Sequence, residues 1–284
     1  MKQVIERAPA KLNLFLEVGQ KRDDGFHDIV SVMQTVSVMD GVTLTLREDG
    51  IFSLQNDKPY LPCDERNVAL AAAKLFAETY GVRQGCHIDI RKGIPVTAGV
   101  GGGSADAAAV LRGMCRLYGV KASREELCKL GEQIGSDVPF CVAGGTALAT
   151  GRGENLQALK TPELQIVFFR SGRKVSTAHA YACLDAHPRN VRSEAGMIEA
   201  LQSGEASSIA LQLYNAFSPL YEENLKQFQA LCAPFSPLGM GLSGAGPTCF
   251  ALFKEGTEAG ACCKTLREQG GYARACHSLR ALHF

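Results

Sequence analysis

Hydrophobic and polar positions alternate over the first part of the chain in a pattern typical of strands. Residues 28–47 are rich in Val, Thr and Ile, and Val42, Leu44 and Leu46 alternate with threonines. Because successive side chains of a strand point to opposite faces, this pattern predicts a sheet with one buried face. Asp40-Gly41 predicts a turn between two strands.

Helical periodicity begins after this region. Asn67 is a suitable N-cap for a helix over 68–80, and Ser123 with Glu126 predicts a capping box for a helix over 123–133. A third helix is predicted over 105–118, directly after a glycine-rich loop. The other predicted elements are strands at 87–92, 165–169, 248–253 and 272–279, helices at 208–214, 222–232 and 257–269, and a glycine-rich turn at 240–246.

Strands and helices are mixed without strict alternation, which favours the α+β class over a doubly wound sheet. With 284 residues, the chain has the length of one large domain or two ordinary ones. The segment 151–162 has the weakest elements, so we expect one domain over 1–155 and a second over 156–284.

Charge and hydropathy exclude several classes of protein. The formal net charge is +1, which argues against a partner such as DNA or RNA. The longest apolar runs, such as 240–246, are too short to cross a bilayer, and the first twelve residues lack the apolar stretch of a secretory signal. We therefore expect a soluble cytoplasmic protein with no membrane partner, either a monomer or a homodimer.

The eleven cysteines do not form a recognisable framework. Their number is odd, no Cys-x-x-Cys occurs, and Cys276-His277 alone does not supply a zinc site. Most of the others lie in apolar or helical surroundings, so we interpret them as reduced residues of the core.

The densest chemical signal is the glycine loop at 98–104, with sequence AGVGGGS, followed by the helix-forming run ADAAA. Glycines allow backbone N–H groups to converge on one point, and the N-terminus of a helix adds partial positive charge. This combination favours phosphate binding, although a plain glycine turn capped by Ser104 is the alternative. The loop has no lysine of the Walker type and fails the dinucleotide fingerprint, and the protein-kinase motifs are absent.

Two further motifs suggest charged groups in or near a core. Lys11 stands among apolar residues in the sequence APAKLNL, and Asp137 precedes Val-Pro-Phe. A buried aspartate needs a partner, and Lys11 is one option. The alternatives are a lysine extending along an edge strand into solvent and an ordinary turn aspartate. A second glycine loop at 239–247 is able to approach a ligand closely.

Taken together, these motifs resemble those of the GHMP small-molecule kinases. The match consists of Lys11 with its neighbours, the loop at 98–109 and the late sequence GLSGAGPT, and it extends from about residue 6 to residue 255. Further motifs resemble the branch of the family that phosphorylates a cytidine-diphosphate-linked methylerythritol. They are DDGFH at 23–27, GSDVP at 135–139, GRGE at 151–154 and VSTA at 175–178.

The resemblance implies an N-terminal domain like ribosomal protein S5, a ferredoxin-like C-terminal domain and an active site in the cleft between them. It implies transfer of the γ-phosphoryl group of ATP, with Mg²⁺, to the 2-hydroxyl of the methylerythritol. Asp137 matches the catalytic aspartate and Lys11 the lysine paired with it. The implied ATP-binding residues are Asn67, Val96, Ala98, Gly99, Val100, Gly101, Gly102, Gly103, Ser104 and Ala105, and the implied substrate-binding residues are Asn13, Phe26, His27, Thr177, Tyr181 and Gly244.

Some positions depart from the family pattern. Phe26 replaces a common tyrosine, and Ala216 and Ser218 replace two acidic residues, which removes any charged role there. For the magnesium ion, we expect Ser104 as the contact ahead of Asp106. Two other functions are compatible with the motifs: a kinase of the same fold acting on homoserine, mevalonate or a sugar, and a catalytically silent regulatory relative. The latter predicts the loss of Lys11 or Asp137, and both are present.

Overall fold

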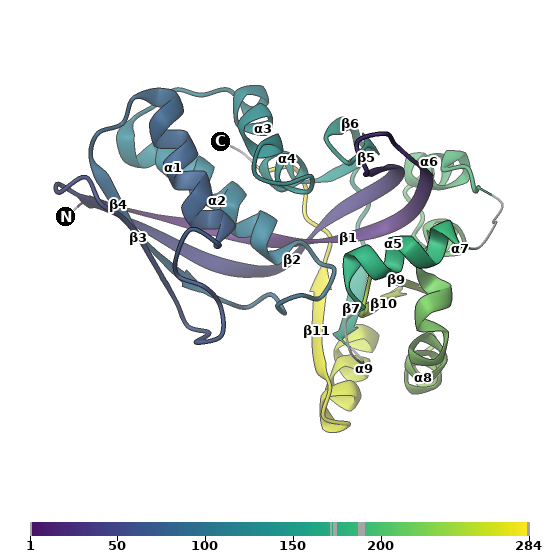
Figure 1. Ribbon diagram of the computed structural model, residues 1–284. Coiled ribbons are helices and arrows are strands. Elements are labelled where there is room, and N and C mark those ends of the chain that lie inside the picture. The colour runs from purple at the N-terminus through teal and green to yellow at the C-terminus, as the bar shows by residue number, and fades with distance from the viewer. Residues whose placement is uncertain (1, 171, 173–174, 187–190, 283–284) are drawn as a thin grey trace.

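The computed structural model describes residues 2–170, 172, 175–186 and 191–282. This part of the chain builds two β-sheets flanked by helices (Figure 1). The first sheet has the order β3-β4-β2-β1-β8, with β5 attached to β2 and β6 to β5. Its strands are β1 (Gln3–Lys21), β2 (His27–Arg47), β3 (Phe52–Asn56), β4 (Gly85–Arg91), β5 (Thr146–Gly151), β6 (Asn155–Leu159) and β8 (Tyr214–Asn215).

Four helices lie on one face of the first sheet, with α2 packed on β1 and β2 (Figure 1). They are α1 (Val68–Tyr80), α2 (Gly102–Tyr118), α3 (Arg124–Glu132) and α4 (Val138–Ala143). The predicted caps are confirmed: the Asn67 side chain accepts a hydrogen bond from the N–H of Ala69, and Ser123 forms a capping box with Glu126. Helix α2 starts three residues before the predicted Ala105, because Gly101 is its N-cap in the left-handed region at φ 72°.

The predicted turn at Asp40-Gly41 is wrong, because β2 runs straight through it. Gly41 pairs with Arg7 on β1 and with Arg91 on β4, as a residue inside a sheet does. The Asp40 carboxylate does not close a local turn. It accepts hydrogen bonds from the backbone N–H groups of Gly93 and Ile94, which are far away in the sequence.

The second sheet is antiparallel, with the order β11-β7-β10-β9. Its strands are β7 (Gln165–Arg170), β9 (Gly239–Leu242), β10 (Thr248–Phe253) and β11 (Tyr272–His277). The helices of this half are α5 (Thr177–Asp185), α6 (Ala195–Ser203), α7 (Ala206–Leu211), α8 (Glu222–Cys232) and α9 (Gly256–Glu268), with 3₁₀ turns at Ser218–Tyr221 and Ala233–Phe235. The helix predicted to reach residue 214 ends at Leu211, because Tyr214 pairs with Phe15 of β1. The first residues of the predicted glycine turn at 240–246 belong to strand β9.

The predicted α+β class with two sheet-based halves is confirmed, and the two halves share contacts. The chain changes sheet between β6 and β7, and the predicted division after residue 155 falls at the first residue of β6. Strand β8 returns to the first sheet, and a bridge joins Val36 to Ser278. These contacts hold the two halves against each other along β1 and β2.

Seven of the eleven cysteines are buried, in agreement with their interpretation as core residues. Burial raises the pKa of the Cys86 thiol to about 12, which keeps it protonated. The buried cysteines are Cys86, Cys141, Cys232, Cys249, Cys262, Cys263 and Cys276.

Candidate active site

A cavity of about 580 Å³ is formed by residues from β1, the two glycine loops, the start of α4 and helix α5. The predicted site residues that line it are Lys11, Asn13, Phe26, His27, Gly99, Gly101, Ser104, Asp137, Thr177, Tyr181 and Gly244. The structure thus brings both predicted catalytic residues and all six predicted substrate-binding residues to one cavity.

Lys11 and Asp137 form an ion pair in this cavity. The Lys11 ammonium is 3.2 Å from Asp137 Oδ2, and the lysine residue is only 5% exposed. The alternative of a lysine extending into solvent is therefore wrong. Asp137 directly precedes α4 but its side chain makes no capping hydrogen bond, so the carboxylate faces Lys11 rather than the helix. One third of the aspartate side chain is exposed, which leaves it accessible to a ligand.

Asn13 connects strand β1 to the second glycine loop. Its Oδ1 accepts hydrogen bonds from the Lys11 ammonium at 3.0 Å and from the Gly244 backbone N–H at 2.9 Å. Its Nδ2 donates to the Ser31 hydroxyl at 2.8 Å. Asn13 is itself buried, so it gives the Lys11 ammonium a partner fixed within the core. They make Asn13 part of the framework that orients the ammonium.

The two glycine loops touch each other. Gly99 has φ 75°, and a Cβ at this position would lie 2.4 Å from the carbonyl oxygen of Ser243. The Ser243 hydroxyl donates to the Gly99 carbonyl oxygen at 2.9 Å. Gly101 has φ 72°, and its Cβ would lie 2.9 Å from Lys11 Cγ. Glycine is therefore required at both positions, by backbone conformation and by close approach.

The N-terminus of α2 opens toward the cavity, with Ser104 in its first turn. A helix of seventeen residues presents unpaired N–H groups and partial positive charge at this end, which favours an anion such as phosphate. The N-cap of α2 is Gly101, so the capping role that the alternative gave to Ser104 is wrong.

The remaining predicted ATP-binding residues do not line the cavity. Ala98, Val100 and Ala105 are core residues. Gly103 is exposed and faces Val68 at the start of α1. The Asn67 side chain is occupied by its cap and by a hydrogen bond to the Pro62 carbonyl oxygen. The other predicted residues of this group are Val96, which is half-buried, and Gly102, which is the first residue of α2.

Aromatic rings and a histidine form the other end of the cavity. His27 is buried, its Nε2 lies 2.7 Å from Asp185 Oδ1, and its ring lies 4.7 Å from that of Tyr181. The Tyr181 ring in turn meets the edge of Phe217 at 5.1 Å. Phe26 is half exposed, with the Arg152 guanidinium 5.1 Å from its ring centre. This arrangement suits a flat, partly polar ring such as a nucleobase.

Sequence reasoning did not assign three residues of this end of the cavity. Arg152 lies in a recognised motif, GRGE, but had no role, and Phe217 lies in the segment where acidic residues are missing. The contacts of that segment involve no charged side chain. Asn215 Nδ2 donates to the carbonyl oxygens of Leu242 and Gly244, and Phe217 lines the cavity. Asp185 has no local sequence signal, because its partner His27 lies in a distant part of the chain.

The two candidates for magnesium differ in their position. Ser104 lines the cavity, whereas Asp106 is buried, binds Lys92 and does not line it. The chain offers no cluster of three or more His, Cys, Asp or Glu side chains able to hold a metal in the part that the structure describes. None of the described helices is both long enough and apolar enough to span a membrane.

Comparison with known families identifies the class. The model for the GHMP kinases N terminal domain matches residues 67–145, and the model for the GHMP kinases C terminal domain matches residues 197–271. The matched segments contain the glycine loop, Asp137 and the second glycine loop. The chain belongs to the GHMP kinases.

Relatives narrow this assignment to one branch. The chain is 42% identical over 254 residues to the 4-diphosphocytidyl-2-C-methyl-D-erythritol kinase of Shouchella clausii (strain KSM-K16), covering 88% of this chain and 85% of that protein. A solved 4-(cytidine 5'-diphospho)-2C-methyl-D-erythritol kinase superposes with a TM-score of 0.82 and 31% identity over 97% of this chain and 99% of the other. A homoserine kinase from Cytophaga hutchinsonii shares the fold, with a TM-score of 0.77 and 20% identity over 99% and 96% of the two chains. Within the GHMP kinases, the chain is a member of the 4-diphosphocytidyl-2-C-methyl-D-erythritol kinase branch.

Proposed function

We propose that this chain is an ATP-dependent kinase that phosphorylates the 2-hydroxyl of 4-diphosphocytidyl-2-C-methyl-D-erythritol, in the non-mevalonate route to isopentenyl diphosphate. One observation carries the proposal: a single cavity holds the Lys11–Asp137 ion pair at one end and the His27–Tyr181 pair at the other. The first end suits phosphoryl transfer to an alcohol, and the second suits the cytosine ring of the named substrate. The relatives in this branch support the same activity.

In the proposed reaction, the hydroxyl oxygen of the acceptor attacks the γ-phosphorus. The bond between that phosphorus and the bridging oxygen to the β-phosphate breaks, and ADP leaves. Asp137 orients the hydroxyl and accepts its proton, and Lys11 holds the carboxylate in place and stabilises the negative charge that develops on the transferred group. Phosphoryl transfer needs positioning and charge stabilisation more than covalent chemistry, and this pair supplies both.

The nucleotide is proposed to bind at the first glycine loop, with its phosphates at the N-terminus of α2. Magnesium prefers oxygen ligands and keeps water molecules, so it needs only one or two protein oxygens besides the phosphates. The Ser104 hydroxyl in the first turn of α2 fits this requirement, and a bound ion would neutralise charge on the phosphates there. Gly102 and Gly103 would contribute backbone N–H groups at this end of α2, and Ala98, Val100 and Ala105 would shape the loop from the core.

His27 would read the polar edge of cytosine. A neutral imidazole has one donor and one acceptor nitrogen, and the contact between Nε2 and the Asp185 carboxylate leaves the other nitrogen for the base. Phe26 and Tyr181 would flank the ring by stacking, a contribution of roughly 1–3 kcal/mol per base. Homoserine, mevalonate and sugars have no flat aromatic ring to stack at this end of the cavity, which disfavours them as acceptors.

The test is ADP release by the purified chain with ATP, magnesium and each acceptor in turn. We expect release with 4-diphosphocytidyl-2-C-methyl-D-erythritol and none above background with homoserine, mevalonate or galactose. Release with another acceptor alone would refute the assignment of the aromatic end. Absence of ADP release with all four acceptors would favour the regulatory alternative and would refute the proposed reaction.

A further inference from the structure

The segment proposed to bind the nucleotide lies between two residues that bind each other. Every predicted ATP-binding residue except Asn67 falls within 93–105. Lys92 precedes this segment directly after β4, and Asp106 follows it within α2. The Lys92 ammonium lies 2.6 Å from the Asp106 carboxylate, so the ion pair closes the base of the whole loop.

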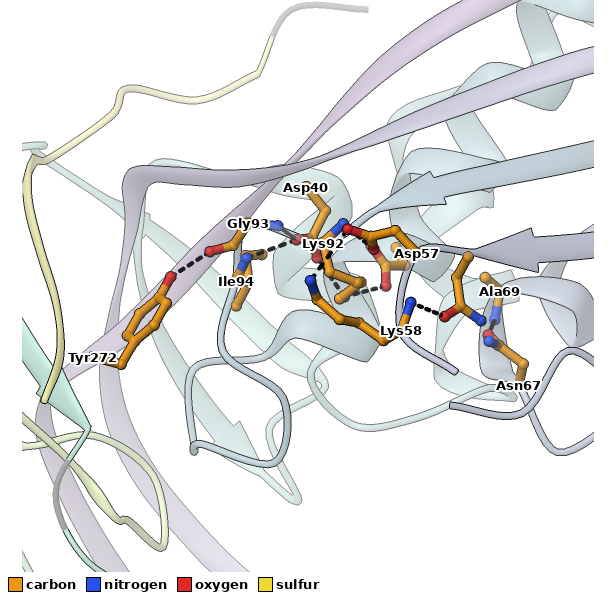
Figure 2. Close-up of polar contacts among 11 residues, drawn as sticks. Asp40, Asp57, Lys58, Asn67, Ala69, Lys92, Gly93, Ile94 and Tyr272 are labelled. Atoms are coloured by element: carbon orange, nitrogen blue, oxygen red, sulfur yellow. Dashed lines mark hydrogen bonds and ion pairs between the residues drawn. The ribbon is translucent and has the colours of Figure 1, made fainter. Parts of the chain in front are cut away.

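Asp40 is the third member of this cluster. Its carboxylate binds the Lys92 ammonium and accepts the backbone N–H groups of Gly93 at 2.6 Å and of Ile94 at 2.7 Å (Figure 2). The three charged side chains are almost fully buried, with exposed fractions of 5% for Lys92, 0% for Asp40 and 7% for Asp106. Buried charges are tolerated only when they are paired, so loss of one partner leaves the others in an unfavourable place.

The charges within the cluster do not balance, since one ammonium faces two carboxyl groups. Burial raises the pKa of Asp106 well above its usual range, and the Lys92 charge opposes this rise only in part. Burial by itself would lower the pKa of Lys92, but the two carboxyl groups raise it overall. Asp106 Oδ1 has no hydrogen-bond partner in the described part of the chain. Lys92 is therefore held between the carboxyl groups of Asp40 and Asp106, and both contribute to keeping it charged.

The loop is also attached to the C-terminal half of the chain, at its start and at its middle. At the start, the Tyr272 hydroxyl of β11 donates to the Gly93 carbonyl oxygen (Figure 2). Further along, the Gly99 carbonyl oxygen accepts from Ser243. A Cβ on Gly93 would lie 2.5 Å from the Met39 carbonyl oxygen, so this turn rests directly on the backbone of β2.

We propose that Lys92, Asp40 and Asp106 form a clasp that positions the ATP-binding loop, and that Tyr272 fixes this clasp to the second sheet. These are positioning residues, because none of them lines the cavity. A loop held closed before binding spares the nucleotide the entropy of closing it, so an intact clasp favours ATP affinity. The inference rests on the proposed ATP site and not on the identity of the acceptor.

The experiment is a direct titration of the full chain with ATP and magnesium, without any acceptor. Asp106→Ala removes one side of the clasp, and we expect the Kd for ATP to rise about tenfold, which corresponds to roughly 1.4 kcal/mol. Asp106→Asn keeps an oxygen for Lys92, and we expect it to restore the Kd to within about threefold of the unaltered chain. The matched control is Glu6→Ala, because Glu6 is also a buried carboxylate that binds α2, through Arg112 and Arg116, away from the loop.

A second pair of variants removes one hydroxyl each and carries little risk to folding. Tyr272→Phe removes the bond to Gly93, and Tyr118→Phe removes comparable bonds to the carbonyl oxygens of Gln84 and Gly85. We expect a higher Kd for ATP only in Tyr272→Phe.

The outcomes separate the clasp from the proposed function. Equal Kd values in Asp106→Ala and Glu6→Ala would overturn the clasp. If Asp106→Ala does not fold, equal values in Tyr272→Phe and Tyr118→Phe would overturn it instead. A wild-type chain that binds no ATP would refute the proposed ATP site, and the clasp with it, whereas ATP binding without transfer to the cytidine compound would refute only the acceptor.

Discussion

Replacement of Gly99 by alanine tests whether the contact between the two glycine loops is needed for phosphoryl transfer. The new Cβ would lie 2.4 Å from the Ser243 carbonyl oxygen and 2.9 Å from that of Gly246. Ordinary van der Waals contact begins at 3.4 Å, so Gly99 and the second loop must separate by about 1 Å. Both obstacles are backbone atoms, so rotation of a side chain cannot relieve the clash.

The size of the effect follows from this displacement. A misplacement of 1 Å in an active site costs about 10²-fold in rate, so we expect kcat/KM of Gly99→Ala to fall by about that factor. Alanine at φ 75° also costs about 1–2 kcal/mol of folding stability, whatever space surrounds it. The control variant must therefore have the same strained backbone conformation without the clash between the loops.

Gly119→Ala is that control. Gly119 has φ 71° as the C-cap of α2, and a Cβ there meets nothing within 4 Å. ADP release gives kcat/KM for both variants, and thermal unfolding gives their stability. We expect similar losses of stability and a loss of activity in Gly99→Ala alone. Activity of Gly99→Ala within about threefold of Gly119→Ala would refute the reasoning, because the contact of the loops would then have no role in transfer.

Three further substitutions test the two ends of the cavity by steady-state kinetics of ADP release. Asp137→Asn should lower kcat by about 10²–10⁴-fold with little change in the Kd for ATP, since it removes the proton acceptor, and an unchanged kcat would contradict that role. His27→Ala should raise the KM for the cytidine substrate and leave that for ATP unchanged, whereas an equal rise in both would argue against nucleobase recognition. Asp185→Ala should raise the same KM less than His27→Ala does, because Asp185 acts through the histidine; a larger effect would indicate direct contact with the substrate.

Local signals in the sequence predicted those parts of the fold that depend on local chemistry. The caps at Asn67 and Ser123 satisfy backbone N–H groups within three residues, so their neighbours in sequence are enough to identify them. Asp40-Gly41 has the composition of a hairpin turn, but the Asp40 carboxylate finds stronger partners in Lys92, Gly93 and Ile94. Pairing with β1 on one side and β4 on the other then keeps this segment extended, and the local sequence cannot predict these distant partners.

The candidate site likewise combines residues that the sequence identifies with contacts that only the fold creates. Lys11 and Asp137 were identified because their motifs resemble those of a family, while spacing alone left open whether they meet. The fold answers this question: β1 brings Lys11 beside the start of α4, and the ion pair forms at 3.2 Å. Asp185 was missed because its role depends on His27, which lies on a different sheet-based half of the chain.

The two ends of the cavity are built from different elements. The residues proposed to transfer the phosphoryl group are therefore separate from those proposed to select the acceptor. The end with the Lys11–Asp137 pair uses β1, the first glycine loop and the start of α4. The aromatic end uses the start of β2 and helix α5, where His27 and Tyr181 meet. Under the proposed function, changes in the β1–β2 turn and in α5 would therefore alter which acceptor enters while the residues for transfer stay in place.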